Sequence, residues 1–332
     1  MKISVLGAGT WGIALARLLA RKGYDVLVFS VIKEEVEELE RTRVHKNLEG
    51  MTIPESIRFT SDIEEACTDR DILLCAVPSV FVRSTMRLAK DHIKDGQIIV
   101  DVAKGIEADT LFTMSRVIED ELKGRNVKVV ALSGPTHAEE VARDMPTTIV
   151  SASKDMAVAE YVQDVFMDTC LRVYTNEDVL GVELCGALKN IIALASGIST
   201  GLGNGDNAKA AIITRGMVEM KRLGLAMGAD KDTFAGLAGI GDLIVTCTSM
   251  HSRNNRCGML IGQGVPVEDA KAQIGMVVEG INALPAAMRL IEKYHVEMPI
   301  TEMVNAVVNN GVDPKTAIPS LMERDKKSEV TV

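Results

Sequence analysis

Short apolar runs rich in β-branched residues alternate with stretches of helical periodicity through the first half of the chain. This alternation predicts strands that are separated by helices. The expected strands cover residues 2–6, 25–29, 71–76, 98–102, 128–132, 147–150 and 172–174, and the clearest helices cover residues 12–22 and 111–122. Because crossovers between parallel strands are right-handed, this order predicts an α/β fold with a doubly wound, mainly parallel sheet, which binds ligands beyond the carboxyl ends of its strands.

After about residue 180 the strand signals fade and helical periodicity takes over, most clearly at 208–223 and 282–294. Glycines at 201–205 and 236–241 indicate loops or close approach of two backbones. A chain of 332 residues is long enough for about two domains. We therefore expect an α/β domain over residues 1–180 and an all-helical C-terminal domain over residues 181–332.

The composition restricts the class of protein and its partners. Hydrophobic residues make up 47% and charged residues 25%, as in ordinary soluble globular proteins. The net charge is −9 and the chain holds only one Trp, four Tyr and six Phe, so nucleic acid is not an expected partner. The N-terminal apolar run is too short for a signal peptide, and no stretch approaches ~18 apolar residues. We expect a cytoplasmic protein without an integral membrane segment.

The cysteines and histidines suggest no metal site. The six cysteines are widely spaced and form no C-x-x-C pair, which favours a reducing compartment and a packing role for each thiol. His45 and His92 fall in predicted surface helices or loops, and His295 falls near a helix end. His137 follows a predicted strand and has the side chain of a general base, but we do not assign it that role.

A glycine motif predicts a dinucleotide site. Residues 7–12 read GAGTWG, a G-x-G-x-x-G pattern that directly follows one predicted strand and opens a helix. Gly7 permits the tight turn, Gly9 lets the backbone approach a pyrophosphate, and Gly12 allows close packing of helix on strand. The helix N-terminus then offers free N–H groups to the phosphates. The motif indicates a Rossmann domain, and the alternative is a plain strand, turn and helix with convenient glycines.

The end of the second predicted strand bears on the choice of cofactor. An NAD site usually carries Asp or Glu about 20 residues after the glycines. Ser30 at that place is not acidic, and Lys33 could attract a 2′-phosphate, so we expect NADP or NAD with a weak preference for NADPH. The alternative is that Lys33 is a solvated charge at the start of a helix, beside Glu34 and Glu35.

Two lysines stand where a charge is unexpected. Lys104 follows the predicted strand 98–102, between Ala and Gly, and should lie at the ligand-binding edge of the sheet. Lys189 and Asn190 interrupt an apolar helix, where burial would lower the pKa of the lysine and make it a usable general acid or base. The alternatives are a surface lysine at 104 and, at 189, a lysine that reaches solvent from a helix flank.

Nine motifs together resemble those of bacterial NAD(P)-dependent sn-glycerol-3-phosphate dehydrogenases. They run in the order of that family over nearly the whole chain, from Gly7 to about Thr301. In sequence they are GAGTWG at 7–12, VAKG at 102–105, SGPT at 133–136, LKNIIA at 188–193, AIITRG at 211–216, GIGDL at 239–243, TCT at 246–248, HSRN at 251–254 and VVEG at 277–280.

The resemblance implies reversible reduction of dihydroxyacetone phosphate to sn-glycerol 3-phosphate, which supplies glycerophospholipid synthesis. It implies that Lys189 transfers the proton, that Lys104 reaches both substrate and cofactor, and that Asp242 is the partner of the substrate hydroxyl. Asp242 could also pair with Lys189 and favour its ammonium form. The helical domain would then bind the substrate and carry the catalysis.

The resemblance also implies two sets of binding residues. Those for the cofactor are Gly7, Gly9, Thr10, Trp11, Gly12, Lys104, Ala138, Arg253, Val277 and Glu279. Those for the substrate are Lys104, Gly134, Thr136, Lys189, Asn190, Asp242, Thr246, Ser252, Arg253 and Asn254. The planar fork of donors on Arg253 suits a phosphate. Val31 stands where many such chains carry Arg or His, which weakens the case for a 2′-phosphate site and leaves use of both cofactors open.

Two other functions stay open at this point. The first is a related two-domain dehydrogenase whose substrate is a small hydroxy acid or ketoacid. The second is a dinucleotide-binding sensor or scaffold without chemistry, although such a module has no use for Lys104, Lys189, Asp242 and Arg253 together. We expect a homodimer, since symmetric dimers are the commonest soluble oligomers.

Overall fold

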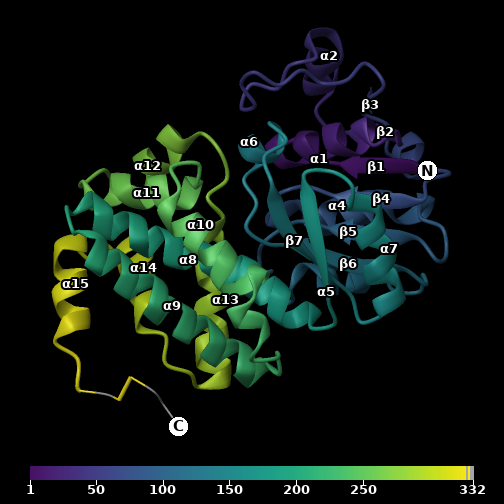
Figure 1. The fold of residues 1–332 in the computed structure, drawn as a ribbon. Coiled ribbons are helices and arrows are strands. Elements are labelled where there is room, and N and C mark those ends of the chain that lie inside the picture. The colour runs from purple at the N-terminus through teal and green to yellow at the C-terminus, as the bar shows by residue number, and fades with distance from the viewer. Residues whose placement is uncertain (327, 330–332) are drawn as a thin grey trace.

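One eight-stranded sheet organises the first half of the chain, drawn in purple to teal in Figure 1. The computed structural model describes residues 1–326 and 328–329; residues 327 and 330–332, which belong to the expected second domain, lie outside the described part. The strand order is β3-β2-β1-β4-β5-β6-β7-β8. The strands are β1 Lys2–Leu6, β2 Asp25–Phe29, β3 Arg58–Thr60, β4 Ile72–Cys75, β5 Ile98–Asp101, β6 Lys128–Ser133, β7 Thr147–Ala152 and β8 Leu171–Asn176.

The pairing confirms the predicted doubly wound, mainly parallel sheet. Neighbouring strands run parallel except β6 and β7, which pair antiparallel. The prediction missed β3, which has three residues and pairs with β2 at the edge of the sheet. A strand this short contains too little alternation to be recognised from its sequence.

Successive strand residues point to opposite faces and so build two cores. In β1, Val5 packs into the cluster that contains Leu15 of α1, whereas Leu6 packs into the cluster with Met86 of α4 and Val117 of α5. Each face of the sheet is therefore covered by helices. The helices of this half are α1 Thr10–Arg21, α2 Lys33–Thr42, α3 Ile63–Cys67, α4 Val82–Ala89, α5 Met114–Glu121, α6 Ala138–Val141 and α7 Met156–Phe166, with short η1 Ser79–Phe81 and η2 Lys90–His92.

The second half is helical, as predicted, and is drawn in teal to yellow in Figure 1. Its elements are α8 Val179–Gly201, α9 Asp206–Met227, η3 Thr233–Ala235, the π-helical turn η4 Leu237–Gly241, α10 Asp242–Thr248, α11 Arg253–Gly262, α12 Val267–Ile274, α13 Glu279–Tyr294, α14 Pro299–Asn310 and α15 Pro314–Met322. The expected boundary between residues 180 and 181 falls in the first turn of α8.

Helix α8 is the core of the helical half, and glycines bring α11 directly against it. A Cβ on Gly197 of α8 would lie 2.1 Å from the Asn255 carbonyl oxygen, and one on Gly258 of α11 would lie 2.3 Å from the Leu194 carbonyl oxygen. Only glycine permits such an approach of two backbones. This contact fixes the start of α11 relative to Lys189 on α8.

The apolar character of α8 also corrects one expectation. We expected no stretch that approaches a membrane span, yet α8 is long and apolar enough by length and composition. In its most apolar window, 89% of the residues are buried inside the protein. The helix is therefore accounted for as the core of a folded domain, where it is apolar all round because other helices surround it.

Candidate active site

The glycine turn joins β1 to α1 at the carboxyl edge of the sheet. Gly7 has a φ of +123°, and a Cβ there would lie 2.7 Å from the Ala76 carbonyl oxygen at the end of β4. A Cβ on Gly12 would lie 2.2 Å from the Gly7 carbonyl oxygen, so the helix can pack this close only without a side chain. At Gly9 nothing lies within 4 Å of an added Cβ, and no side chain caps the start of α1. The turn thus fits a pyrophosphate, as the motif predicts.

Two lysines share one buried carboxylate at the same edge. Lys189 Nζ lies 2.5 Å from Asp242 Oδ1, and Lys104 Nζ lies 2.7 Å from Asp242 Oδ2. Lys189 also donates to Thr246 Oγ1 at 2.6 Å, and Lys104 donates to the Gly134 carbonyl at 3.0 Å. The structure therefore brings together five of the residues that the sequence singled out. We call Lys104, Lys189 and Asp242 the lysine–carboxylate centre.

The burial of this centre excludes the alternatives of a surface lysine at 104 and of a lysine at 189 that reaches solvent. The side chains of Lys189 and Asp242 are 7% and 0% exposed, and that of Lys104 is 17% exposed. Neither lysine extends to solvent from a surface. Each ammonium has a carboxylate oxygen as partner, which is the usual condition for burying a charge.

The pKa of Lys189 is lowered to about 8. Burial is the main cause, and the nearby Lys104 charge adds to it, while Asp242 opposes both. A lysine with a pKa of about 8 can lose or gain a proton near neutral pH, which is what a general acid or base requires.

The turn before α10 delivers Asp242 to the lysines. The π-helical turn η4 ends at Gly241, and Asp242 is the first residue of α10. A Cβ on Gly239 would lie 2.2 Å from the Phe234 carbonyl oxygen, so the turn packs directly on the chain of η3. Single π-turns of this kind are frequent at functional sites.

A second polar group surrounds the N-terminus of α11. Asn254 donates to Asn190 Oδ1 at 2.9 Å and accepts from the Gly280 N–H at 2.9 Å. Ser252 caps the helix by accepting from the Asn255 N–H at 3.2 Å. Arg253, whose pKa burial lowers, donates to the Val277 carbonyl at 3.3 Å. A partly buried arginine at a helix N-terminus offers a place for an anion.

Glu279, at the start of α13, contacts a residue that the sequence analysis missed. Its carboxylate accepts from the Ser79 N–H at 2.9 Å and from Ser79 Oγ at 2.6 Å. Burial raises the pKa of Glu279, against the hydrogen bonds from Ser79. A Cβ on Gly105 would lie 2.3 Å from Ser79 Cβ, so Gly105 makes room for Ser79. The signal was present, because Ser79 follows a strand end just as Lys104 does.

The remaining predicted site residues lie around these groups. Thr10 and Trp11 begin α1, and Ala138 begins α6. Trp11 and Ala138 both pack against the core cluster of α1, so Trp11 has a packing role as well. Thr136 Oγ1 donates to the Gly134 carbonyl at 3.2 Å, the same oxygen that accepts from Lys104.

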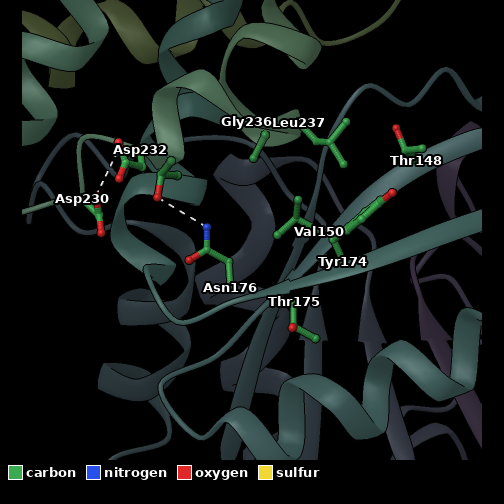
Figure 2. Close-up of a pocket in the computed structure, with 11 residues that line it drawn as sticks. Thr148, Val150, Tyr174, Thr175, Asn176, Asp230, Asp232, Gly236 and Leu237 are labelled. Atoms are coloured by element: carbon green, nitrogen blue, oxygen red, sulfur yellow. Dashed lines mark hydrogen bonds between the residues drawn. The ribbon is translucent and has the colours of Figure 1, made fainter.

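A cavity of about 470 Å³ opens beside β7 and β8, and none of the predicted site residues lines it (Figure 2). Figure 2 shows Gly236 and Leu237, where η4 begins, at its wall. It also shows the hydrogen bond from Asn176 to Thr233, which is 3.4 Å long. Its lining residues are Thr148, Val150, Tyr174, Thr175, Asn176, Asp230, Asp232, Thr233, Gly236, Leu237 and Ala238.

The position of His45 corrects one expectation, whereas the interpretation of His137 as no general base stays a prediction. His45, expected at the surface, is 5% exposed, because its side chain bonds to the Ala8 backbone next to the glycine turn. His137 is half-buried and burial lowers its pKa. Among residues 1–326 and 328–329, no three His, Cys, Asp or Glu side chains are grouped so that they could hold a metal ion.

Comparison with known proteins gives matches over both halves of the chain. The model for the N-terminus of NAD-dependent glycerol-3-phosphate dehydrogenase matches residues 2–159, and the model for its C-terminus matches residues 178–319. Glycerol-3-phosphate dehydrogenase (NAD(P)+) 2 of Lactobacillus delbrueckii subsp. bulgaricus is 64% identical over 99% of each chain. The corresponding Fusobacterium nucleatum protein is 51% identical over 99% of each.

Solved structures agree with these matches. Glycerol-3-phosphate dehydrogenase from Coxiella burnetii superposes with a TM-score of 0.93 at 37% identity, over 97% of this chain and 99% of the other. D-mandelate dehydrogenase with NADH superposes with a TM-score of 0.65 at 16% identity, over 96% of this chain and 99% of the other, a likeness that shows the fold alone.

Proposed function

Since this chain belongs to the NAD-dependent glycerol-3-phosphate dehydrogenase family, we propose that its lysine–carboxylate centre performs the proton transfer of that family's reaction. The enzyme is an NAD(P)-dependent oxidoreductase that reversibly reduces dihydroxyacetone phosphate to sn-glycerol 3-phosphate. The observation that carries the proposal is the single Asp242 carboxylate between two ammonium groups. The glycerol-3-phosphate dehydrogenase activity therefore replaces the two alternatives from the sequence, a hydroxy-acid dehydrogenase and a scaffold without chemistry.

Lys189 is the proton donor in ketone reduction. When bound, the reduced nicotinamide supplies the hydride that forms the new C–H bond at C2 of the substrate. The carbonyl π pair moves to the oxygen, and Lys189 donates a proton to that oxygen and becomes neutral. Its pKa of about 8 suits this exchange in both directions, since solvent can restore the proton at neutral pH.

Lys104 and Asp242 prepare the centre for this step. Lys104 is held by Asp242 and by the Gly134 carbonyl, so its ammonium is fixed beside Lys189 and can stabilise negative charge that develops on the substrate oxygen. Asp242 keeps Lys189 in its ammonium form below pH ~8, against the cost of burial. Asp242 can also accept from the substrate hydroxyl. Thr246 fixes the Lys189 ammonium from a second side.

The N-terminus of α11 is the proposed site of the substrate phosphate. Ser252, Arg253 and Asn254 present a hydroxyl, a guanidinium and an amide there, and the helix dipole adds a partial positive charge. Asn190 connects this group to the helix that carries Lys189, since it accepts from Asn254 at 2.9 Å. The phosphate would therefore hold the ketone at a fixed distance from the proton donor.

The cofactor would bind along the glycine turn and towards the start of α13. The open space over Gly9 and the uncapped start of α1 suit its pyrophosphate, with Thr10 and Trp11 beside it. Glu279, held by Ser79, and the neighbouring Val277 would contact its other end, together with Lys104, Ala138 and Arg253.

We also propose a cytoplasmic homodimer that supplies glycerol 3-phosphate to glycerophospholipid synthesis. Cytoplasmic location is supported by six cysteines, all free thiols. The domain division near residue 180 is supported by the end of the sheet at Asn176 and the start of α8 at Val179. Light scattering after size exclusion tests the dimer, and a monomeric mass would refute it.

The decisive experiment follows the absorbance of NADH, and separately of NADPH, when dihydroxyacetone phosphate is added. Unphosphorylated dihydroxyacetone is the control for the phosphate site. The Lys189→Ala variant should lose turnover by about 10²-fold to 10⁴-fold, the usual contribution of a general acid, while it still binds cofactor. Turnover that survives in this variant would refute the assignment of Lys189.

A further inference from the structure

We propose that Glu35 determines the choice of cofactor and makes this enzyme prefer NAD(H) to NADP(H). The inference rests on the proposed function, since it concerns the same cofactor site. The sequence alone gave a weak preference for NADPH, because Ser30 at the end of the second strand is not acidic. The structure reverses that argument, since it brings a carboxylate to Ser30 from the following helix.

Ser30 holds the Glu35 carboxylate at the carboxyl end of β2. Ser30 is 6% exposed, and its Oγ donates to Glu35 Oε2 at 2.6 Å. The same Oγ accepts from the Ile32 N–H at 3.2 Å, and the Ser30 N–H donates to the Thr60 carbonyl at 3.1 Å. The serine is thus fixed by the backbone on both sides. The carboxylate it binds has a defined place at the edge of the sheet.

The loop of His45 and Asn47 connects the surroundings of Glu35 to the glycine turn. His45, 5% exposed, bonds to the backbone of Ala8, and the negative charge of Glu35 raises the pKa of its imidazole against the effect of burial. Asn47 Nδ2 lies 3.4 Å from Thr10 Oγ1, which ties the same loop to the start of α1. Glu35 is therefore held at the end of β2, beside the loop of His45 and Asn47 that contacts the glycine turn.

This is the place where an acidic residue selects NAD in dinucleotide-binding folds. A carboxylate there accepts from the ribose 2′-hydroxyl of NAD and repels the 2′-phosphate of NADP. Here the acid comes from the first turn of α2 instead of the strand end. Spacing from the glycines therefore concealed its role.

The lysines near the end of β2 are exposed, whereas the Glu35 carboxylate is held in place by Ser30. Lys33 is exposed on the first turn of α2, and Lys46 is exposed beside His45. Val31, where a guanidinium or imidazole would hold a 2′-phosphate, is 68% exposed and uncharged. The ordered charge at the end of β2 is thus negative, and the positive charges are on long exposed side chains that lose entropy when they bind.

The test uses the single tryptophan as its probe. Trp11 lies in the glycine turn, so its fluorescence should report cofactor binding without substrate and without turnover. Dissociation constants for NADH and for NADPH are measured on the full chain, for the native protein, Glu35→Gln and Glu34→Gln. Glu34 is the matched control, because it is exposed on the same helical turn next to Glu35. Thermal unfolding checks that each variant is folded.

The native protein should bind NADH at least tenfold more tightly than NADPH. In Glu35→Gln this preference should fall by at least tenfold, chiefly through tighter NADPH, whereas Glu34→Gln should keep the native ratio within about twofold. Equal or tighter binding of NADPH by the native protein would overturn the inference. An unchanged ratio in Glu35→Gln would overturn it as well. Failure of the proposed function is a separate result, namely cofactor binding without oxidation when dihydroxyacetone phosphate is added.

Discussion

Replacing Asp242 by Asn should move the pH dependence of the reaction rather than only slow it. Asp242 lies 2.5 Å from the Lys189 ammonium and 2.7 Å from the Lys104 ammonium. Asn keeps the shape of the side chain but removes its charge. Lys189 then loses the partner that opposes burial, while the Lys104 charge still lowers the Lys189 pKa. The proton donor should become neutral at a lower pH.

The size of the effect follows from the geometry. Opposite unit charges about 3 Å apart attract by ~5.5 kcal/mol at an effective dielectric constant near 20. Relaxation of the site and entry of water offset part of this. If one quarter of this attraction remains, the substitution removes ~1.4 kcal/mol of stabilisation from the Lys189 ammonium. Such a loss lowers the pKa of Lys189 by about one unit. We therefore expect the midpoint to move down by at least about one pH unit.

The assay is kcat for reduction of dihydroxyacetone phosphate between about pH 6 and 9.5, at saturating cofactor. For the native enzyme, kcat should fall with a midpoint near the Lys189 pKa of about 8. For Asp242→Asn the midpoint should lie near 7 or below. Thr246→Val is the control, because it removes a hydrogen bond of 2.6 Å to Lys189 without removing a charge. A midpoint that is equal in the native enzyme and Asp242→Asn would refute the electrostatic role of Asp242.

Three further predictions concern other contacts. Ser79→Ala removes the hydroxyl that donates to Glu279 at 2.6 Å, and should weaken cofactor binding several-fold with unchanged thermal stability; an unaltered dissociation constant by Trp11 fluorescence would contradict it. Gly258→Ala places a Cβ 2.3 Å from the Leu194 carbonyl oxygen and should cost about 1–3 kcal/mol, seen as a lower urea midpoint. Glu219 of α9 is buried, and its carboxylate accepts from the Ile300 N–H at the start of α14 at 2.7 Å; burial raises its pKa from 4.5 to about 7. Its contribution to stability is therefore present below pH ~4.5 and lost as pH rises through ~7, by up to ~3 kcal/mol. Urea unfolding at pH 5 and pH 8 should show this loss in the native protein but not in Glu219→Gln, and equal pH dependence in both would count against it.

The sequence by itself determined the elements and the edge of the sheet where chemistry occurs. Alternation of apolar runs and helical stretches is a local property, so β1 and β2 have the predicted bounds and the other predicted strands differ from theirs at the ends only. Strand ends can be read from the same pattern, which is why the glycine turn and Lys104 were placed at one edge. The three-residue β3 escaped, because it is too short to show a period.

The tertiary structure decided which charges meet. Asp242 is 53 residues from Lys189 and 138 from Lys104, and Ser79 is 200 residues from Glu279. No period or spacing relates residues so far apart, and their contact depends on how the helical half packs against the sheet. The place of Glu35 is also a matter of packing, because the end of β2, the first turn of α2 and the loop of His45 converge there. The sequence specifies the chemistry of each side chain. Two lysines share the Asp242 carboxylate only because the fold brings all three side chains within a few ångströms of one another.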